Sequence, residues 1–144
     1  MIVTFCGHRE LQFKEDLRIW LEYTIEKLIN SGANLFFLGG YGAFDEMTAE
    51  IVWNMKKQYP YIKTILVLPY AKKQFDGSKY DGVLYPNLEG VSDRYAIIHR
   101  NRWMVDSADV VVAYVDHNYG GAYKTLEYAE SKKKIITQYE MKYK

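Results

Sequence analysis

Apolar residues follow two alternating patterns along the chain. Four short stretches are mainly apolar throughout, as expected for strands buried on both faces, at residues 2–6, 34–38, 62–68 and 109–115. Elsewhere apolar residues recur at three- and four-residue spacing, which predicts helices. These helices are expected near residues 17–29, 47–59, 95–107 and 121–132, with a last strand near 134–137.

The alternation of strands and helices indicates an α/β fold. Buried strands joined by helical connections form a doubly wound, mostly parallel sheet with helices on both faces. The segment 70–92 is irregular in pattern, with a short strand expected at 83–85. No internal repeat or linker interrupts the 144 residues, and this length is close to the commonest domain size. We therefore expect residues 1–144 to form one domain.

The residues that carry chemistry follow the expected strands. In a parallel sheet the loops after the strands lie at one edge, where ligands bind. Four such loops, at 7–9, 39–46, 69–80 and 116–121, should therefore converge, and their glycines allow backbone N–H groups to approach an anion. We predict that these loops and the adjoining helices contact the ligand through Gly7, His8, Arg9, Gly39, Gly40, Tyr41, Gly42, Asp45, Arg102, Gly120, Gly121 and Lys124.

Several of these residues also have a purely structural interpretation. The run 39–42 lacks the glycine spacing of dinucleotide-binding folds and the Gly-Lys-Ser/Thr of a P-loop, so a tight strand-to-helix turn explains it about as well. Asp45 and Glu46 stand where a helix begins, a position at which capping and the helix dipole favour acidic residues. His8 and Arg9 are either phosphate ligands or solvated turn residues.

Composition narrows the class of protein. The formal net charge is only +1, whereas nucleic-acid binders usually carry a basic excess, so we expect no nucleic-acid partner. No apolar run reaches the roughly 20 residues that cross a bilayer. The single cysteine, Cys6, agrees with a cytoplasmic location and is interpreted as a core residue, with a reactive thiol as the minority alternative. His117 has no second histidine at metal-ligand spacing, so neither a metal nor a cofactor is expected.

The helix expected at 95–107 bears on oligomeric state. At about 100° per residue, one face holds Ile97, Ile98, Met104, Val105 and Ala108. The opposite face holds His99, Trp103 and Asp106. An exposed tryptophan is uncommon without a partner surface, so we expect a homodimer that covers Trp103. The alternative is that segment 70–92 covers Trp103 within one chain.

Four segments together carry a resemblance to a known group of proteins: residues 4–9 (TFCGHR), 39–45 (GGYGAFD), 67–70 (VLPY) and 100–105 (RNRWMV) through 120–122 (GGA). In this order they resemble the SLOG superfamily, Rossmann-like proteins grouped around the DNA-processing protein Smf/DprA and the LONELY GUY phosphoribohydrolases. The likeness is greatest to a small stand-alone, YpsA-like bacterial and phage branch. It implies a Rossmann-like fold that binds a nucleotide-derived or ADP-ribose-like ligand.

The pattern of the LONELY GUY enzymes can be followed residue by residue. It places an Arg on a helix, then a strand, then P-G-G-x-G-T-x-x-E. Here Arg100 takes the Arg position, Gly120 and Gly121 the glycine pair, and Glu127 the Glu. In those enzymes the Arg and Glu serve cleavage of the N-glycosidic bond of a nucleoside 5′-monophosphate. The resemblance therefore implies Arg100 and Glu127 as catalytic residues.

This chain departs from that pattern at three positions. Tyr119 replaces the Pro, Tyr123 the later Gly and Lys124 the Thr. Tyr123 fills space that the enzymes leave for ligand phosphate, and Lys124 offers a compensating cation. We therefore expect binding of a nucleotide-derived ligand first, with phosphoribohydrolase activity as the alternative. A single-stranded DNA-binding module, like Smf/DprA, is the second alternative.

Overall fold

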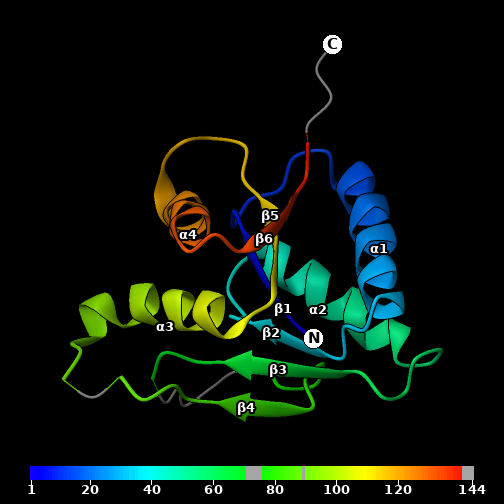
Figure 1. The fold of residues 1–144 in the computed structure, drawn as a ribbon, viewed down its shortest axis with the longest axis horizontal. Helices are drawn as coiled ribbons and strands as arrows, with labels where there is room; N and C mark the ends of the chain where they lie inside the picture. The colour runs from blue at the N-terminus through cyan, green and yellow to red at the C-terminus, as the bar shows by residue number, and fades with distance from the viewer. Residues whose placement is uncertain (71–75, 89, 141–144) are drawn as a thin grey trace.

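The computed structural model describes residues 1–70, 76–88 and 90–140. Within these ranges the chain forms six strands and four helices (Figure 1). The strands are β1 (Ile2–Gly7), β2 (Leu35–Leu38), β3 (Lys63–Val67), β4 (Gly82–Leu84), β5 (Val110–Tyr114) and β6 (Ile135–Gln138). The helices are α1 (Lys14–Asn30), α2 (Ala43–Met55), α3 (Asp93–Ser107) and α4 (Gly120–Ser131).

The strands form one sheet in the order β4-β3-β2-β1-β5-β6. Every neighbouring pair is parallel, so the α/β fold expected from the sequence is confirmed. From β1 the chain winds outward to β4, and α3 then returns it to β5 on the other side of β1. Because β1 and β5 are neighbours whose chains leave toward opposite faces, a crevice is expected between the loops that follow them.

Helices cover both faces of the sheet, with α1 and α2 on one side and α3 and α4 on the other (Figure 1). Successive side chains of β1 point to opposite faces of the sheet, so they pack against the two helix layers in turn. Val3 and Phe5 belong to the core beneath α1 and α2, whereas Cys6 packs with Val105 and Leu126 beneath α3 and α4. None of the helices in the described ranges combines the length and the apolar character needed to cross a membrane.

The buried face of α3 agrees with the expected one at Met104, Val105 and Ala108 but differs from it nearer the start of the helix. Ile97 and Ile98 are 36% and 42% exposed, so their assignment to the buried face was wrong. Arg100 is instead buried, at 4% exposed, because its guanidinium donates to backbone carbonyls at the edge of the sheet. A buried charge with such partners overrides the apolar pattern that places the isoleucines inward.

Trp103 was also expected to be exposed, and this prediction was wrong. Its ring stacks on Phe37 of β2, with the ring centroids 5.5 Å apart, and packs beside Val67 and Met104. The tryptophan therefore has a partner within its own chain. Segment 70–92, the other cover considered, has residues 71–75 and 89 outside the described ranges. Trp103 no longer supports a homodimer, which remains a prediction without that argument.

Candidate functional site

A cleft of about 680 Å³ opens at the carboxyl edge of the sheet. It is lined by the loops after β1, β2 and β5, by α3 and by the start of α4. The lining includes these predicted residues: Gly7, His8, Arg9, Tyr41, Asp45, Arg100, Gly120 and Gly121. It also includes residues that the sequence analysis did not select, among them Glu10, Gln12, Asn101, Asp116, His117, Tyr119 and Thr125.

Other predicted residues lie outside this lining: Gly39, Gly40, Gly42, Arg102, Lys124 and Glu127. The first three belong to the turn behind the cleft. Arg102 places its guanidinium 5.1 Å from the centre of the Tyr128 ring, and Lys124 and Glu127 are exposed on α4. The cleft thus contains Arg100 but not Glu127, the residue implied as its catalytic partner.

The fourth loop expected at the site, 69–80, contributes nothing to the lining among its described residues. Residues 71–75 of this loop lie outside the described ranges. Pro69 and Tyr70 instead line a second cleft of about 390 Å³, together with Tyr85 and Pro86. Three of the four loops therefore meet at one site.

Arg100, on α3, joins this helix to the end of β3 and to the turn after β2. Its Nη1 donates to the carbonyl oxygens of Val67 and Gly39, at 2.8 and 3.1 Å, and its Nε donates to Asn101 Oδ1 at 2.9 Å. Burial lowers the pKa of the guanidinium, and the nearby Asp45 carboxylate opposes that change. Arginine nevertheless stays charged in proteins. Arg100 therefore contributes a fixed positive charge whose Nη1 and Nε donors are occupied by the fold.

Asp45 is an ionisable group that can exchange a proton near neutral pH. It lies in the first turn of α2 and its Oδ2 accepts the backbone N–H of Tyr41 at 3.0 Å. Burial raises the pKa of this carboxyl to about 6, although the Tyr41 N–H and the charge of Arg100 act in the opposite direction. Asp45 thus stands in the first turn of α2 as expected, but it bonds Tyr41, the residue before the N-cap Gly42, instead of capping the helix. Its carboxyl also lines the cleft, where it can donate or accept a proton.

The start of α4 offers backbone donors to an anion. The N-cap residue, Tyr119, makes no side-chain hydrogen bond to the helix, and Gly120, with φ of 91°, and Gly121 begin the helix at the cleft. Such an end carries N–H groups without intrahelical partners and the positive end of the helix dipole. Arg9 also lines the cleft, with its guanidinium 4.2 Å from the centre of the Tyr41 ring.

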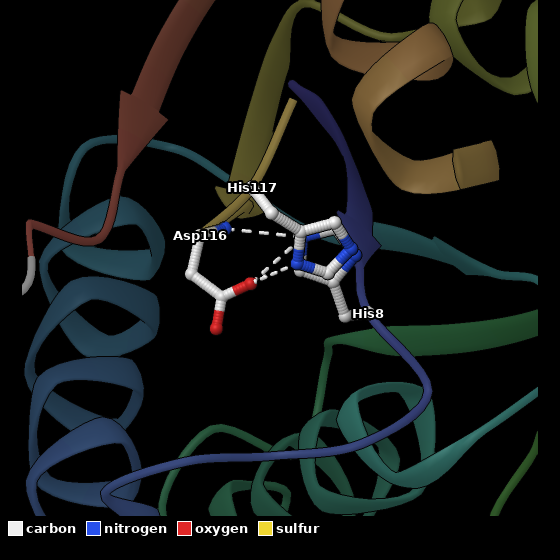
Figure 2. Close-up of side chains that lie close together, drawn as sticks. All are labelled: His8, Asp116 and His117. Atoms are coloured by element: carbon white, nitrogen blue, oxygen red, sulfur yellow. Dashed lines mark hydrogen bonds and ion pairs between the residues drawn. The ribbon is translucent and has the colours of Figure 1, made fainter. Parts of the chain in front are cut away.

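Two histidines and an aspartate form a cluster where the loops after β1 and β5 meet (Figure 2). The imidazoles of His8 and His117 stack with centroids 3.5 Å apart. Asp116 Oδ1 lies 2.5 Å from His117 Nδ1 and 3.2 Å from His8 Nε2. Among the described residues this is the group whose donor atoms suit a metal ion.

His8 is a neutral imidazole in this arrangement, because its Nε2 accepts the backbone N–H of Asp116 at 3.0 Å. Burial and the neighbouring His117 lower the pKa of His8, and Asp116 opposes them. Only 8% of His8 is exposed, so it is not a solvated turn residue, while its contact with a ligand stays a prediction. The β1–β5 pairing, which sets Gly7 opposite Tyr114, brings the residues that follow into contact.

No family model matches the chain. In sequence it is similar to a UPF0398 protein from Bacillus pumilus (strain SAFR-032), at 21% identity over 85% of this chain and 77% of that protein. It is also similar to a UPF0398 protein from Lysinibacillus sphaericus (strain C3-41), at 26% identity over 38% of this chain and 30% of that protein.

Solved structures show a similar fold. DNA processing protein A from Helicobacter pylori, described for its single-stranded DNA binding mode, matches with a TM-score of 0.72 and 16% identity, over 99% of this chain and 66% of that chain. DNA processing protein A from Streptococcus pneumoniae matches with a TM-score of 0.67 and 17% identity, over 94% and 49%. TM1055, a structural genomics target, matches with a TM-score of 0.64 and 17% identity, over 94% and 71%.

The chain therefore spans slightly less than two thirds of the Helicobacter pylori structure and about half of the one from Streptococcus pneumoniae. At such identities a structural likeness shows the fold and not the activity. The parallel sheet and helices of the described residues, together with these likenesses, give the chain a Rossmann-like α/β fold.

Proposed function

We propose that this protein binds a nucleotide or nucleotide-derived small molecule in the cleft at the carboxyl edge of the sheet. The observation that carries this proposal is the meeting of the α4 N-terminus, Arg9 and Asp45 around about 680 Å³ of space. Small-molecule sites typically occupy about 300–1,000 Å³, so the cleft has the right size for one mononucleotide or dinucleotide.

The cleft offers a separate place for each part of such a ligand. The backbone N–H groups of Gly120 and Gly121 suit a phosphate, since helix N-termini favour anions. Arg9 adds a cation that is exposed, unlike Arg100. Tyr119, which is 67% exposed, offers an aromatic face on which a base can stack.

Calorimetry with AMP, ADP, NAD and ADP-ribose tests the proposal, with wild type and Gly121→Ala side by side. A methyl group on Gly121 meets no atom within 4 Å, so this variant should fold normally. It should bind the phosphate-bearing ligand at least about tenfold more weakly, because the methyl group stands where backbone must approach the anion. Equal affinities, or no saturable binding of any of the four compounds, would contradict the proposal.

Single-stranded DNA is the second candidate, supported by the likeness to a protein described as binding it. This support runs against the expectation, drawn from net charge, of no nucleic-acid partner. The cleft itself favours the small ligand, since its lining mixes Arg9 with Glu10, Asp45 and Asp116 instead of forming the continuous basic groove that follows a single strand. Anisotropy of a labelled oligothymidine separates the two candidates: binding at physiological salt that AMP does not displace would favour DNA.

Phosphoribohydrolase activity is a weaker candidate. It rests on Arg100 and Glu127, of which only Arg100 lines the cleft. The Nη1 of Arg100 is already bonded to the carbonyls of Gly39 and Val67 and its Nε to Asn101, which leaves Nη2 to hold a substrate phosphate. We also propose that the protein is a cytoplasmic homodimer of the YpsA-like branch. The lone cysteine supports the cytoplasmic location. The likeness to the YpsA-like branch is carried by residues 4–9 and 39–45.

A further inference from the structure

We propose that His8, Asp116 and His117 form a binding site for a divalent transition-metal ion such as Zn²⁺ or Co²⁺. Imidazole nitrogen and carboxylate oxygen are the donors that these ions accept in proteins. The proposal does not depend on which organic ligand occupies the cleft. It runs against the expectation from sequence that the chain holds no metal, which rested on the absence of a second histidine near His117 in the sequence.

The three donor atoms already lie within coordinating range of a common point. Asp116 Oδ1 is 2.5 Å from His117 Nδ1 and 3.2 Å from His8 Nε2, and all three donors lie within 4.8 Å of one another. Bonds of about 2.0–2.2 Å to a shared ion set neighbouring donors about 3.0–3.5 Å apart. The cluster therefore needs adjustments of ångström size rather than a rearrangement of the backbone.

The surrounding residues hold the ligands in place. The Tyr114 hydroxyl lies 3.2 Å from Asp116 Oδ2, the carboxylate oxygen that the two histidines leave free, and it donates a hydrogen bond to that oxygen. The Tyr114 ring meets the His8 ring edge to face, with centroids 5.9 Å apart. Hydrogen bonds of this kind orient metal-binding carboxylates and raise affinity. Tyr114 itself is fully buried in the core, so the support is rigid.

The site is open on one side only. The side chains of His8 and Asp116 are 8% and 9% exposed, whereas that of His117 is 33% exposed. All three residues line the cleft, which gives an ion a route from solvent. Three protein ligands leave at least one coordination position for water or for an oxygen of a bound anion.

Metal binding must replace three contacts, of which the first is the hydrogen bond between His117 Nδ1 and Asp116 Oδ1. The His8 Nε2 lone pair now accepts the Asp116 N–H, and the two rings lie nearly parallel, with 11° between their planes. Ring nitrogens coordinate along the ring plane, so one imidazole must tilt out of the stack. His117 is the partly exposed histidine, and its ring also lies against that of Tyr119, with centroids 4.0 Å apart, so the exposed Tyr119 ring must move with it. The expected affinity is accordingly micromolar rather than that of a structural zinc site.

Titration of the chelator-treated full chain with Zn²⁺ and Co²⁺ at pH 7.5 tests this inference. Wild type should bind one equivalent, and Co²⁺ should give visible absorption bands that report nitrogen coordination. His117→Ala should weaken binding at least about tenfold and remove those bands. His99→Ala is the matched control, because His99 is exposed on α3 and is not part of the cluster. It should bind the metal as wild type does.

Two results would overturn the inference: no saturable binding below about 1 mM free Zn²⁺, a concentration far above that of a micromolar site, or unchanged affinity in His117→Ala. Circular dichroism establishes whether each variant folds. Should His117→Ala fail to fold, Asp116→Asn decides, since it keeps the side-chain shape and removes the charge that a cation needs. Undiminished binding by Asp116→Asn would count against the site in the same way.

Discussion

The Nη1 atom of Arg100 lies 2.8 Å from the carbonyl oxygen of Val67, which fixes α3 to the end of β3. Replacing Arg100 with Lys should lower the free energy of unfolding by about 2–4 kcal/mol, because an ammonium cannot reproduce the planar fork and buried carbonyls lose their donors. Urea unfolding measures the change. Arg102→Lys, at an exposed position, should change stability by less than about 0.5 kcal/mol. Equal losses in the two variants would contradict this role.

The carboxyl of Asp45 makes stability depend on pH. Its pKa in the folded chain is about 6, above its ordinary 3.8, so the native state binds the proton more tightly than the unfolded state. This stabilisation is complete below about pH 4 and is lost as pH rises through about 6. We expect a loss on the order of 1–3 kcal/mol that is missing in Asp45→Asn. Urea unfolding at several values from pH 4 to 7 compares the two proteins, and parallel curves would refute the prediction.

Two glycines should respond differently to alanine. Gly42 has φ of 96°, and a methyl group there would lie 2.9 Å from Arg9 Cα, so Gly42→Ala should cost about 2 kcal/mol or more. Gly121 has open space around it, and Gly121→Ala should leave the melting temperature within a few degrees of wild type. Thermal unfolding of both variants provides the comparison. A larger loss in Gly121→Ala would show that the α4 turn is packed more tightly than described.

Trp103→Ala tests whether the tryptophan serves the fold or an interface. Because the ring stacks on Phe37 within the chain, its removal should lower the free energy of unfolding by about 2 kcal/mol. The mass in solution should be the same for wild type and variant. Light scattering at high concentration measures it and also tests the homodimer, since a mass of one chain for wild type would rule the dimer out.

Glu127→Gln separates a binding protein from a phosphoribohydrolase. Glu127 is exposed and does not line the cleft, so the variant should bind nucleotides within about twofold of wild type. A catalytic Glu127 would instead show as a loss of base release from nucleoside monophosphates by about 100-fold. Chromatography of free base after long incubation makes the measurement. Release of base by wild type that Glu127→Gln abolishes would establish the enzyme and displace our proposal.

The fold could be predicted because its signals are periodic. Continuous apolar runs mark β1, β2, β3 and β5, and each lies within one or two residues of its expected bounds. The prediction failed nearer the start of α3, where a buried Arg100 determines the face that meets the sheet. Hydropathy scales treat arginine as a surface residue. Apolar periodicity therefore does not reveal an arginine whose partners are backbone carbonyls distant in sequence, at the end of β3 and in the turn after β2.

The candidate site could be predicted only in part. Topology alone puts the loops after β1, β2 and β5 at one edge, and this brought in Arg9, Asp45 and Gly121. The cluster of His8 with His117 was missed because their proximity depends on the register of β1 against β5. A pairing between strands so far apart in the sequence leaves no spacing motif. The signal that was available is positional, since both histidines come shortly after a strand end.

The place of β1 has a consequence for how the chain acquires its structure during synthesis. This strand is made first, yet one of its two neighbours is β5, with Val3 paired to Val110. The core beneath α1 and α2 likewise includes Val110, Val112 and Tyr114. Contacts between residues so distant in sequence form slowly, because a long loop of chain must close, with a loss of entropy, before these contacts stabilise the structure. Until β5 emerges from the ribosome, the first half of the chain should remain loosely ordered and open to chaperones.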